Sequence, residues 1–477
     1  MQSNNKYILI SIVSSLTLYF LLIFWGHNSA ISATAAITLC TAMLWVTEAI
    51  PIPATSLIPF FGFPMAGVID YKEAASALGS HVILLLMGAF MLSKALEKSN
   101  VHSRLAYYLV NITGGKSAKR LVLGFMLTAA ILSMWISNSA TTLMLLPITL
   151  AVLKHVKDPR LTIAMLLGIA YAASLGGVGT PVGTPPNIIF MSVFLESQGK
   201  EINFLEWMKT GVPIVVIGIP VIAWWLTRKL DDKQEFILPK SGKWLPAEKR
   251  VLIIFLGIAL AWMFRPYWTV WLNMPSIGDS TVALVGVLVM FLVPNGNRTE
   301  LPNTKVDATK KEKFGEVVEK PKSDKLLDWE TAVDIPWGML LLFAGGICIA
   351  KAFSASGLSE LLGQLLTGLS ALPVPLLILS ICLFVTFLTE ITSNTATATL
   401  LMPILAATGM AAGIDPALMM MPAAISASCA FMLPVATAPN AIVYGMNKFS
   451  IQTMAREGFM LNVFLAFIIT GVSYFTI

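Results

Sequence analysis

Two short polar segments interrupt long apolar runs in this 477-residue chain, and the second repeats the pattern of the first. Residues 133–148 read SMWISNSATTLMLLPI and residues 389–404 read TEITSNTATATLLMPI, an offset of 256 positions. Each segment holds a triplet of serine, asparagine and a second hydroxyl residue, with a proline ten positions after the serine. The triplets are Ser137-Asn138-Ser139 and Ser393-Asn394-Thr395. Because polar groups at membrane depth are costly without partners, the matched pair predicts a functional site.

Composition places the chain in a membrane. It is 56% hydrophobic and 12% charged, with a mean hydropathy of +0.78, whereas soluble domains carry about 25% charged residues. These values exclude an ordinary soluble domain and predict an all-α polytopic membrane protein. The cysteines lie far apart in apolar runs, without metal-ligand spacing, and we expect core residues and no disulfide framework. They are Cys40, Cys348, Cys382 and Cys429.

Apolar runs of span length predict eleven transmembrane helices. A span needs roughly 20 apolar residues, fewer when neighbouring helices help. The first run lacks a small-residue cleavage site, so we expect a retained helix and no signal peptide. The candidates are residues 7–25, 31–49, 52–69, 81–98, 161–195 (interrupted), 209–228, 250–272, 279–294, 337–353, 417–449 (interrupted) and 458–476. Two further stretches, about 120–153 and 373–412, carry the triplets at their centres and predict re-entrant hairpins.

The basic residues predict an orientation. If Lys6 is cytoplasmic and the spans alternate, 27 of the 32 Lys and Arg residues fall on the cytoplasmic side, as the positive-inside rule requires. The first hairpin then enters from the cytoplasm, the second from outside, and the C-terminus lies outside. Residues 295–336 are rich in Lys, Glu and Pro and predict a solvated cytoplasmic linker. Loops of this kind account for the net charge of +6, and we expect no nucleic-acid partner.

Two more segments repeat between the halves. GTPVGTPPNIIF at residues 179–190 echoes MLPVATAPNAIV at residues 432–443, offset by 253, and LLLMGAFMLSKA at residues 84–95 echoes LLFAGGICIAKA at residues 341–352, offset by 257. The halves are therefore colinear, and hairpins entering from opposite faces make the repeat inverted in topology. Inverted repeats with broken helices meeting at mid-membrane are a design of secondary transporters.

The proline-rich segments predict the chemistry of the site. Prolines remove backbone donors and disfavour helix at the preceding residue, so each segment breaks a span into two half-helices. The unwound carbonyls suit a small cation such as Na⁺, and the helix N-termini suit a carboxylate. Asn, Ser and Thr side chains supply both donors and acceptors. Two anion-binding half-sites across a pseudo-two-fold axis predict a ligand with two carboxylates.

Several residues allow two interpretations. Glu48 and Glu390 are the only carboxylates in the apolar runs, which favours Na⁺ over proton coupling. Glu390 could tune a cation site, although a helix-end or pairing role fits the sequence at least as well; we interpret Glu48 as structural. Ser133 and Thr389 could lie one turn from the triplets on the same face or bond back to their own helices. Five tryptophans are expected at the interface or in packing: Trp135, Trp224, Trp225, Trp268 and Trp271.

Motifs along nearly the whole chain resemble the divalent anion/sodium symporter family, which includes the sodium-coupled dicarboxylate transporters. They are WVTEAIPIPATSLIP, MWISNSATT, GTPVGTPPN, DWETAVDIPWGMLLLFAGG, EITSNTATATLLMPI and ASCAFMLPVATAPNAIVYG. The last is similar to a family signature of the form Ser-x-x-Phe-x-x-Pro-aliphatic-small-x-x-x-Asn, through Ser428, Phe431, Pro434, Ala436 and Asn440. Ser139 departs from the threonine usual in the family, which keeps the hydroxyl and loses a methyl group.

This resemblance implies a homodimer in which each protomer has a scaffold and a transport domain moving as an elevator. The scaffold would comprise residues 1–119 and 230–372, and the transport domain residues 120–229 and 373–477. One Na⁺ would be held by Ser133, Ser137, Asn138 and the Gly183 carbonyl, and a second by Thr389, Ser393, Asn394 and the Ala436 carbonyl. The substrate carboxylates would be held by Asn138, Ser139, Thr184, Asn394, Thr395 and Thr437.

The predicted function is Na⁺-coupled symport of C4 dicarboxylates such as succinate, fumarate and malate across a bacterial inner membrane. The alternatives within the family are a Na⁺-independent dicarboxylate exchanger and a carrier of citrate or sulfate. An intramembrane enzyme is disfavoured because the spans contain no HExxH-like or GxSxG-like motif and the four histidines are scattered. An ion channel is disfavoured because hairpins and broken helices on an inverted repeat favour alternating access.

Overall fold

The structure is a computed structural model that describes residues 2–113, 117–154, 156, 158–230, 244–296, 324–365 and 372–477. Across these residues the chain forms helices and one isolated β-bridge, between Pro294 and Lys325. Eight of the described helices are long and apolar enough to cross a membrane, or nine if one bent pair is counted as a span. The all-helical membrane fold is thus confirmed, whereas the number of eleven spans stays a prediction.

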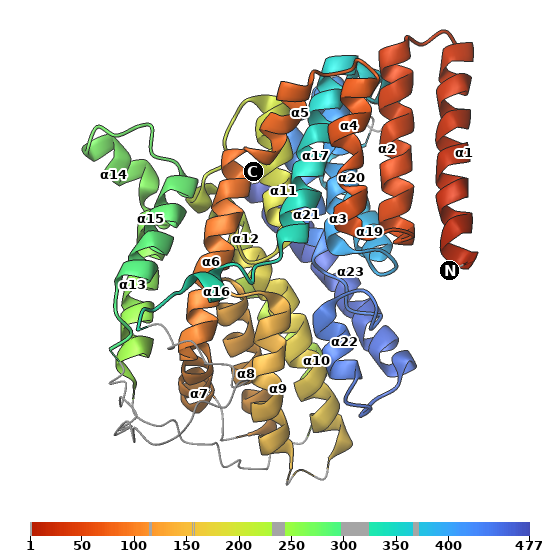
Figure 1. Ribbon diagram of the computed structural model, residues 1–477. Coiled ribbons are helices and arrows are strands. Elements are labelled where there is room, and N and C mark those ends of the chain that lie inside the picture. The colour runs from red at the N-terminus through yellow and green to blue at the C-terminus, as the bar shows by residue number, and fades with distance from the viewer. Residues whose placement is uncertain are drawn as a thin grey trace, which may run out of the picture.

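The N-terminal helices begin at one flank of the molecule and extend across to its opposite side (Figure 1). They are α1 (Gln2–Phe24), α2 (Ser29–Thr47), α3 (Ile52–Thr55), α4 (Ile58–Met65), α5 (Tyr71–Leu78), α6 (His81–Ser99) and α7 (Val101–Thr113). The predicted span 52–69 contains two short helices, because Pro59 at the start of α4 has no N–H with which to continue α3. Glu48 terminates α2 in the left-handed conformation, with φ 48°, in keeping with its structural interpretation.

The first hairpin and the first broken helix occupy the next segment. Their elements are α8 (Ala118–Ser133), α9 (Asn138–Leu153), α10 (Pro159–Gly176), η1 (Gly177–Gly179), α11 (Pro185–Gln198) and α12 (Phe204–Thr227). Helices α8 and α10 approach closely, since a Cβ at Gly176 would lie 2.4 Å from the Cα of Ala130. The chain leaves α8 at Ser133 and enters α9 at Asn138, so the triplet lies at the turn between the two arms.

A further set of helices follows between the two broken helices. They are α13 (Pro246–Met263), α14 (Arg265–Trp271), α15 (Asp279–Leu292), α16 (Trp329–Ala332), α17 (Trp337–Ser356) and α18 (Leu358–Leu365). Helices α13 and α14 meet at an angle of 78°, so the predicted span 250–272 is sharply bent. Pro266 near the start of α14 removes the backbone donor that a continuous helix would use there. Most of the predicted linker 295–336 lies outside the described residues.

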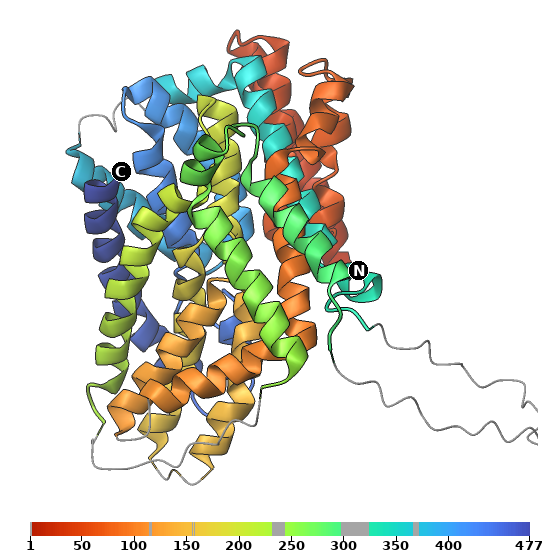
Figure 2. The ribbon, with the colours of Figure 1, turned by 90° about the vertical axis from the view of Figure 1, so that its left-hand side faces the viewer.

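The second hairpin and the second broken helix close the chain. They comprise α19 (Val374–Thr389), α20 (Asn394–Ala412), α21 (Pro416–Ala427), α22 (Ala438–Tyr444) and α23 (Ile451–Thr476). Elements of the two halves pack on each other: α9 and α10 contact α22, α11 contacts α20 and α21, and α12 contacts α23. Helices α6, α13 and α15 pack together beside this body, and α17 packs against α2, α4 and α5 (Figures 1 and 2).

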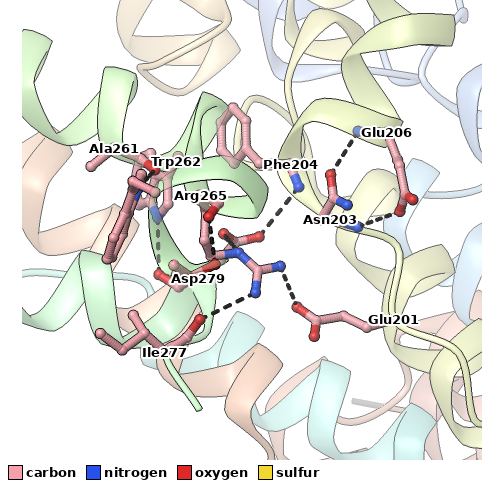
Figure 3. A network of polar contacts seen from close by, with 11 residues as sticks. Glu201, Asn203, Phe204, Glu206, Ala261, Trp262, Arg265, Ile277 and Asp279 are labelled. Atoms are coloured by element: carbon pink, nitrogen blue, oxygen red, sulfur yellow. Dashed lines mark hydrogen bonds and ion pairs between the residues drawn. The ribbon is translucent and has the colours of Figure 1, made fainter. Parts of the chain in front are cut away.

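A polar network, largely buried apart from Glu201, joins the start of α12 to the bend between α13 and α15 (Figure 3). The guanidinium of Arg265 lies 2.6 Å from Oδ1 of Asp279 and 3.0 Å from Oε1 of Glu201. The other carboxylate oxygen of Asp279 accepts the backbone N–H of Phe204, the first residue of α12, at 3.3 Å. The indole of Trp262 donates to the Asp279 carbonyl at 2.9 Å. These contacts join the start of α12 to α13, α14 and α15.

Removal of the cation from this network should destabilise the protein. Arg265→Met leaves the Asp279 carboxylate, which is 4% exposed, without its counter-ion, and breaking such a pair costs about 3–5 kcal/mol. We expect a lower thermal unfolding midpoint for purified protein in detergent. The double variant Arg265→Met with Asp279→Asn, which removes both charges, should recover part of the loss. Equal midpoints for the wild type and Arg265→Met would contradict this account.

Candidate functional site

A cavity of about 590 Å³ lies where the two hairpin turns and the two broken helices meet. Both triplets and both proline-rich segments line it, so segments from the two halves of the repeat share one space. Ten of the twelve residues predicted for the site lie on its wall: Ser137, Asn138, Ser139, Gly183, Thr184, Ser393, Asn394, Thr395, Ala436 and Thr437. The remaining two, Ser133 and Thr389, are fully buried and do not line the cavity.

Four helices begin at the cavity wall. Their N-cap residues, all cavity-lining, are Ser137 for α9, Thr184 for α11, Ser393 for α20 and Thr437 for α22. The first turn of a helix has backbone N–H groups without intrahelical acceptors and carries a partial positive charge. The hydroxyls of Ser137 and Thr437 accept one such N–H each, at 3.3 and 3.2 Å. The cavity is thus suited to an anion that contacts several of these helix ends.

The buried hydroxyls behind the turns orient the two triplet asparagines. Ser133 donates to Oδ1 of Asn138 at 2.6 Å, and Thr389 lies 2.7 Å from Oδ1 of Asn394. Thr389 also lies 3.0 Å from the Ala427 carbonyl. Neither hydroxyl bonds back to its own helix; each reaches across the turn to the residue five positions later. The equivalent contact in both halves fixes each amide at the cavity wall.

Asparagines of the proline-rich segments hydrogen-bond to backbone carbonyls at the helix breaks. The Nδ2 group of Asn187 donates to the carbonyls of Gly177 and Thr180, at 3.0 and 2.8 Å. In the second half, Nδ2 of Asn440 donates to the carbonyls of Ala430 and Leu433, at 2.9 and 3.0 Å. Both side chains are fully buried. These amides donate to backbone carbonyls at the helix breaks, so they shape the loops from behind the cavity.

Two predicted Na⁺ ligands converge beside Gly177. A Cβ at Gly177 would lie 2.7 Å from Oδ1 of Asn138 and 3.0 Å from the Gly183 carbonyl oxygen, so both oxygens border the same small space. Uncharged carbonyl and amide oxygens are suitable ligands for a small hard cation. In the second half, Ala436 stands opposite Gly183 and Ala430 opposite Gly177, at the offset of 253. A methyl group thus replaces the hydrogen there, and the two half-sites are not equivalent.

Glu390 anchors the second broken helix. Its carboxylate oxygens accept the backbone N–H groups of Phe431, Met432 and Leu433, at 2.7, 2.9 and 3.0 Å. A fourth donor, Nδ2 of Asn462 on α23, lies 2.7 Å away. Of the two roles left open by the sequence, these contacts support pairing. In the first half the equivalent position is Met134, whose backbone carbonyl accepts the hydroxyl of Thr180.

Sequence reasoning missed the opposite wall of the cavity. Lys94 and Glu97 of α6 lie there with Asp334, which precedes α17. The ammonium of Lys94 lies 2.9 Å from Oδ2 of Asp334 and 3.2 Å from Oε2 of Glu97. The repeated segment ending in Ser-Lys-Ala carried a signal for Lys94, because its copy ends in Ala-Lys-Ala. Trp135, expected to pack, stacks on Phe204 with ring centroids 6.0 Å apart and lines the cavity as well.

A methyl group beside the first predicted Na⁺ site should weaken Na⁺ binding there. In Gly177→Ala the new Cβ would lie 2.7 Å from Asn138 Oδ1, closer than Cβ contacts in proteins allow, and 3.0 Å from the Gly183 carbonyl oxygen, a tight contact. We expect the Na⁺ concentration that gives half of the maximal rise in the unfolding midpoint to increase about tenfold, the equivalent of 1.4 kcal/mol. Na⁺ titration of purified protein by a thermal-shift assay measures this. Gly257→Ala, where a Cβ meets nothing within 4 Å, is the control. Unchanged Na⁺ titrations would exclude this site.

Na⁺ binding at the second predicted site should depend on Glu390. In Glu390→Gln an NH₂ group replaces one acceptor oxygen and faces backbone donors, so the segment 431–433 loses at least one hydrogen bond to a charged group. Such bonds contribute about 1.5–3 kcal/mol. We expect a lower unfolding midpoint and a weaker response to Na⁺. Glu48→Gln, at the other carboxylate of the apolar runs, should leave both unchanged; a matching loss in that variant would make the effect non-specific.

Comparisons with known proteins place the chain among membrane carriers. Residues 42–421 match the sequence profile of the citrate transporter family. The chain is 39% identical over 466 residues to a protein of Staphylococcus saprophyticus named sodium-dependent dicarboxylate transporter SdcS, covering 93% of this chain and 85% of the relative. The protein of the same name from Staphylococcus aureus is 37% identical over 463 residues, covering 92% and 85%.

Two solved structures share the fold. The YdaH transporter of Alcanivorax borkumensis superposes with a TM-score of 0.55 over 85% of this chain and 87% of its own, at 14% identity. MtrF of Neisseria gonorrhoeae, described as one of a class of antimetabolite efflux pumps, superposes with a TM-score of 0.57 over 90% of this chain and 85% of its own, at 13% identity. At these identities the likeness concerns the fold alone.

Proposed function

The chain belongs to the citrate transporter family of membrane carriers, with the staphylococcal sodium-dependent dicarboxylate transporters among its relatives, and we propose that it is a Na⁺-coupled dicarboxylate transporter. The family consists of carriers and not of enzymes. The observation that carries the proposal is the cavity on which four helix N-termini converge, two from each half of an inverted repeat.

The substrate follows from the symmetry of these helix ends. Each half contributes one hairpin turn and one broken helix, so each half offers backbone N–H groups, an asparagine amide and hydroxyls to one carboxylate. Two carboxylates separated by a short carbon chain would occupy both halves together, as in succinate, fumarate or malate. We assign the substrate contacts to residues of both halves: Asn138, Ser139, Thr184, Asn394, Thr395 and Thr437.

Na⁺ would travel with the substrate and bind the loop oxygens. The first site would use Ser133, Ser137, Asn138 and the Gly183 carbonyl, and the second Thr389, Ser393, Asn394 and the Ala436 carbonyl. Asn138 and Asn394 belong to both the cation and the substrate sites. Because each amide offers its oxygen to the cation and its NH₂ group to a carboxylate, binding of Na⁺ would preorganise the donor for the anion. This shared side chain couples the two ligands.

Transport would proceed by an elevator movement within a homodimer in a bacterial inner membrane. Support comes from the packing: the hairpins and broken helices of residues 120–229 and 373–477 contact one another extensively. Helices α8, α9 and α10 extend well beyond the end of α1 and α2 (Figure 1). If α1 and α2 mark the membrane, the transport domain is displaced toward one side, which the basic residues predict to be the cytoplasm. We place the scaffold in residues 1–119 and 230–372.

Uptake of labelled succinate into proteoliposomes tests the proposal. We expect uptake driven by an inward Na⁺ gradient and absent with an equal K⁺ gradient. Asn138→Ala and Asn394→Ala each remove hydrogen bonds to a charged ligand, and we expect uptake at subsaturating substrate to fall about tenfold or more. Asn111→Ala, at an exposed asparagine of α7 that does not line the cavity, should transport as the wild type does.

Other outcomes would redirect the assignment. Na⁺-independent uptake that needs internal dicarboxylate would indicate an exchanger. Transport of citrate or sulfate with no uptake of succinate would overturn the C4 substrate and keep the carrier. Folded protein that carries none of these anions would contradict the proposal.

A further inference from the structure

A lysine occurs at the same repeat position in both halves, and the transport chemistry described above uses neither. Lys94 lies on α6 and Lys351 on α17, offset by 257, the offset of the segments that contain them. Helix α6 runs down and α17 runs up the view in Figure 1, as an inverted repeat requires. The two ammonium groups therefore belong toward opposite sides of the membrane.

The carboxylate partners of the two lysines are not repeated. Lys94 pairs with Asp334 and Glu97, whereas Lys351 lies 3.4 Å from Glu196 of α11. The positions equivalent to Asp334 and Glu196 are Ala77 and Phe449, at the offsets of their segments. The two halves therefore share the lysine but not its carboxylate partner.

The surroundings of the two lysines differ in this conformation. Helix α17 packs against α11, and the Lys351–Glu196 ion pair spans this closed contact. The symmetry-related helices, α6 and α22, both line the cavity, and Lys94 faces that space. Among the described residues that line the cavity, Lys94 is the one with a cationic side chain. Its partner Asp334 has a side chain that is 80% exposed, so solvent weakens the pair and a ligand carboxylate can replace it.

We propose that Lys94 and Lys351 are alternating receptors for the dianionic substrate, each acting when the cavity opens on its own side of the membrane. In an inverted-repeat carrier, one half in one state adopts the arrangement that the other half has in the opposite state. Opening of the α11–α17 contact would therefore expose Lys351 as Lys94 is exposed here. Each ammonium would exchange its protein carboxylate for a substrate carboxylate as the substrate enters or leaves. This inference rests on the proposed dicarboxylate transport.

Sided transport assays test the inference. Initial rates of Na⁺-dependent succinate transport are measured in whole cells, for the outer face, and in inside-out vesicles, for the cytoplasmic face. We expect Lys94→Gln to raise KM about three- to tenfold on the predicted cytoplasmic face only, in the range of one partly exposed ion pair. Lys351→Gln should do the same on the outer face only. Lys94→Arg and Lys351→Arg should restore KM toward wild type.

Two lysines outside the cavity are matched controls. Lys98 lies one turn beyond Lys94 on α6 and pairs with Asp328 at 2.6 Å, and Lys209 is exposed on α12. Lys98→Gln and Lys209→Gln should leave KM unchanged on both faces. If Lys351→Gln is unstable because Glu196 loses its partner, the double variant with Glu196→Gln replaces it.

The outcomes separate this inference from the proposed function. If the wild type transports succinate and both lysine variants keep its KM on both faces, the proposed role of Lys94 and Lys351 is wrong, while the carrier function stands. A rise in KM on both faces for either variant would also overturn the sided role and indicate a general effect on the site. Wild-type protein that does not transport succinate would contradict the function itself.

Discussion

The cost of leaving backbone polar groups unpaired in an apolar environment explains most of the site. Four helices begin in the middle of this molecule, so their first N–H groups and the carbonyls of the preceding loops have no intrahelical partners. Loops of this kind exist at membrane depth only where protein groups or a water-filled cavity satisfy them. Buried amides of Asn187 and Asn440 satisfy the carbonyls, and the cavity exposes the remaining groups to a ligand. The proposed anion binding and the stability of the loops would thus have the same physical origin.

The two halves of the repeat solve this problem with different side chains. A carboxylate, Glu390, holds three consecutive N–H groups in the second half, whereas the carbonyl of Met134 and the hydroxyl of Thr180 meet in the first. Gly177 leaves space beside Asn138 where Ala430 carries a methyl group. The two predicted Na⁺ sites would consequently be unequal in shape, although their predicted ligands correspond one to one.

Much of the site was predictable from the sequence because its residues lie in short repeated motifs. The triplets and the proline-rich segments named ten residues that the structure brings to one cavity, and the resemblance to a sodium-coupled carrier family is confirmed by the relatives. Ser133 and Thr389 were placed correctly near the turns, but their partners were not foreseen. A hydrogen bond across a turn depends on side-chain rotamers that spacing along a helix does not specify.

The sequence by itself determined the membrane environment, the inverted repeat and the positions of the helix breaks, because hydropathy, internal similarity and proline chemistry are local properties of the chain. Only the tertiary structure decided which surfaces face the cavity. Lys94 and Asp334 are 240 positions apart, and the role of Glu390 depends on donors 41 to 72 positions away. Such contacts arise from the packing of whole helices, whose relative displacement no local pattern encodes. In this structure α6 and α22 face each other across the cavity, whereas the equivalent helices α17 and α11 are packed together. The two halves of a nearly symmetric repeat therefore have different surroundings.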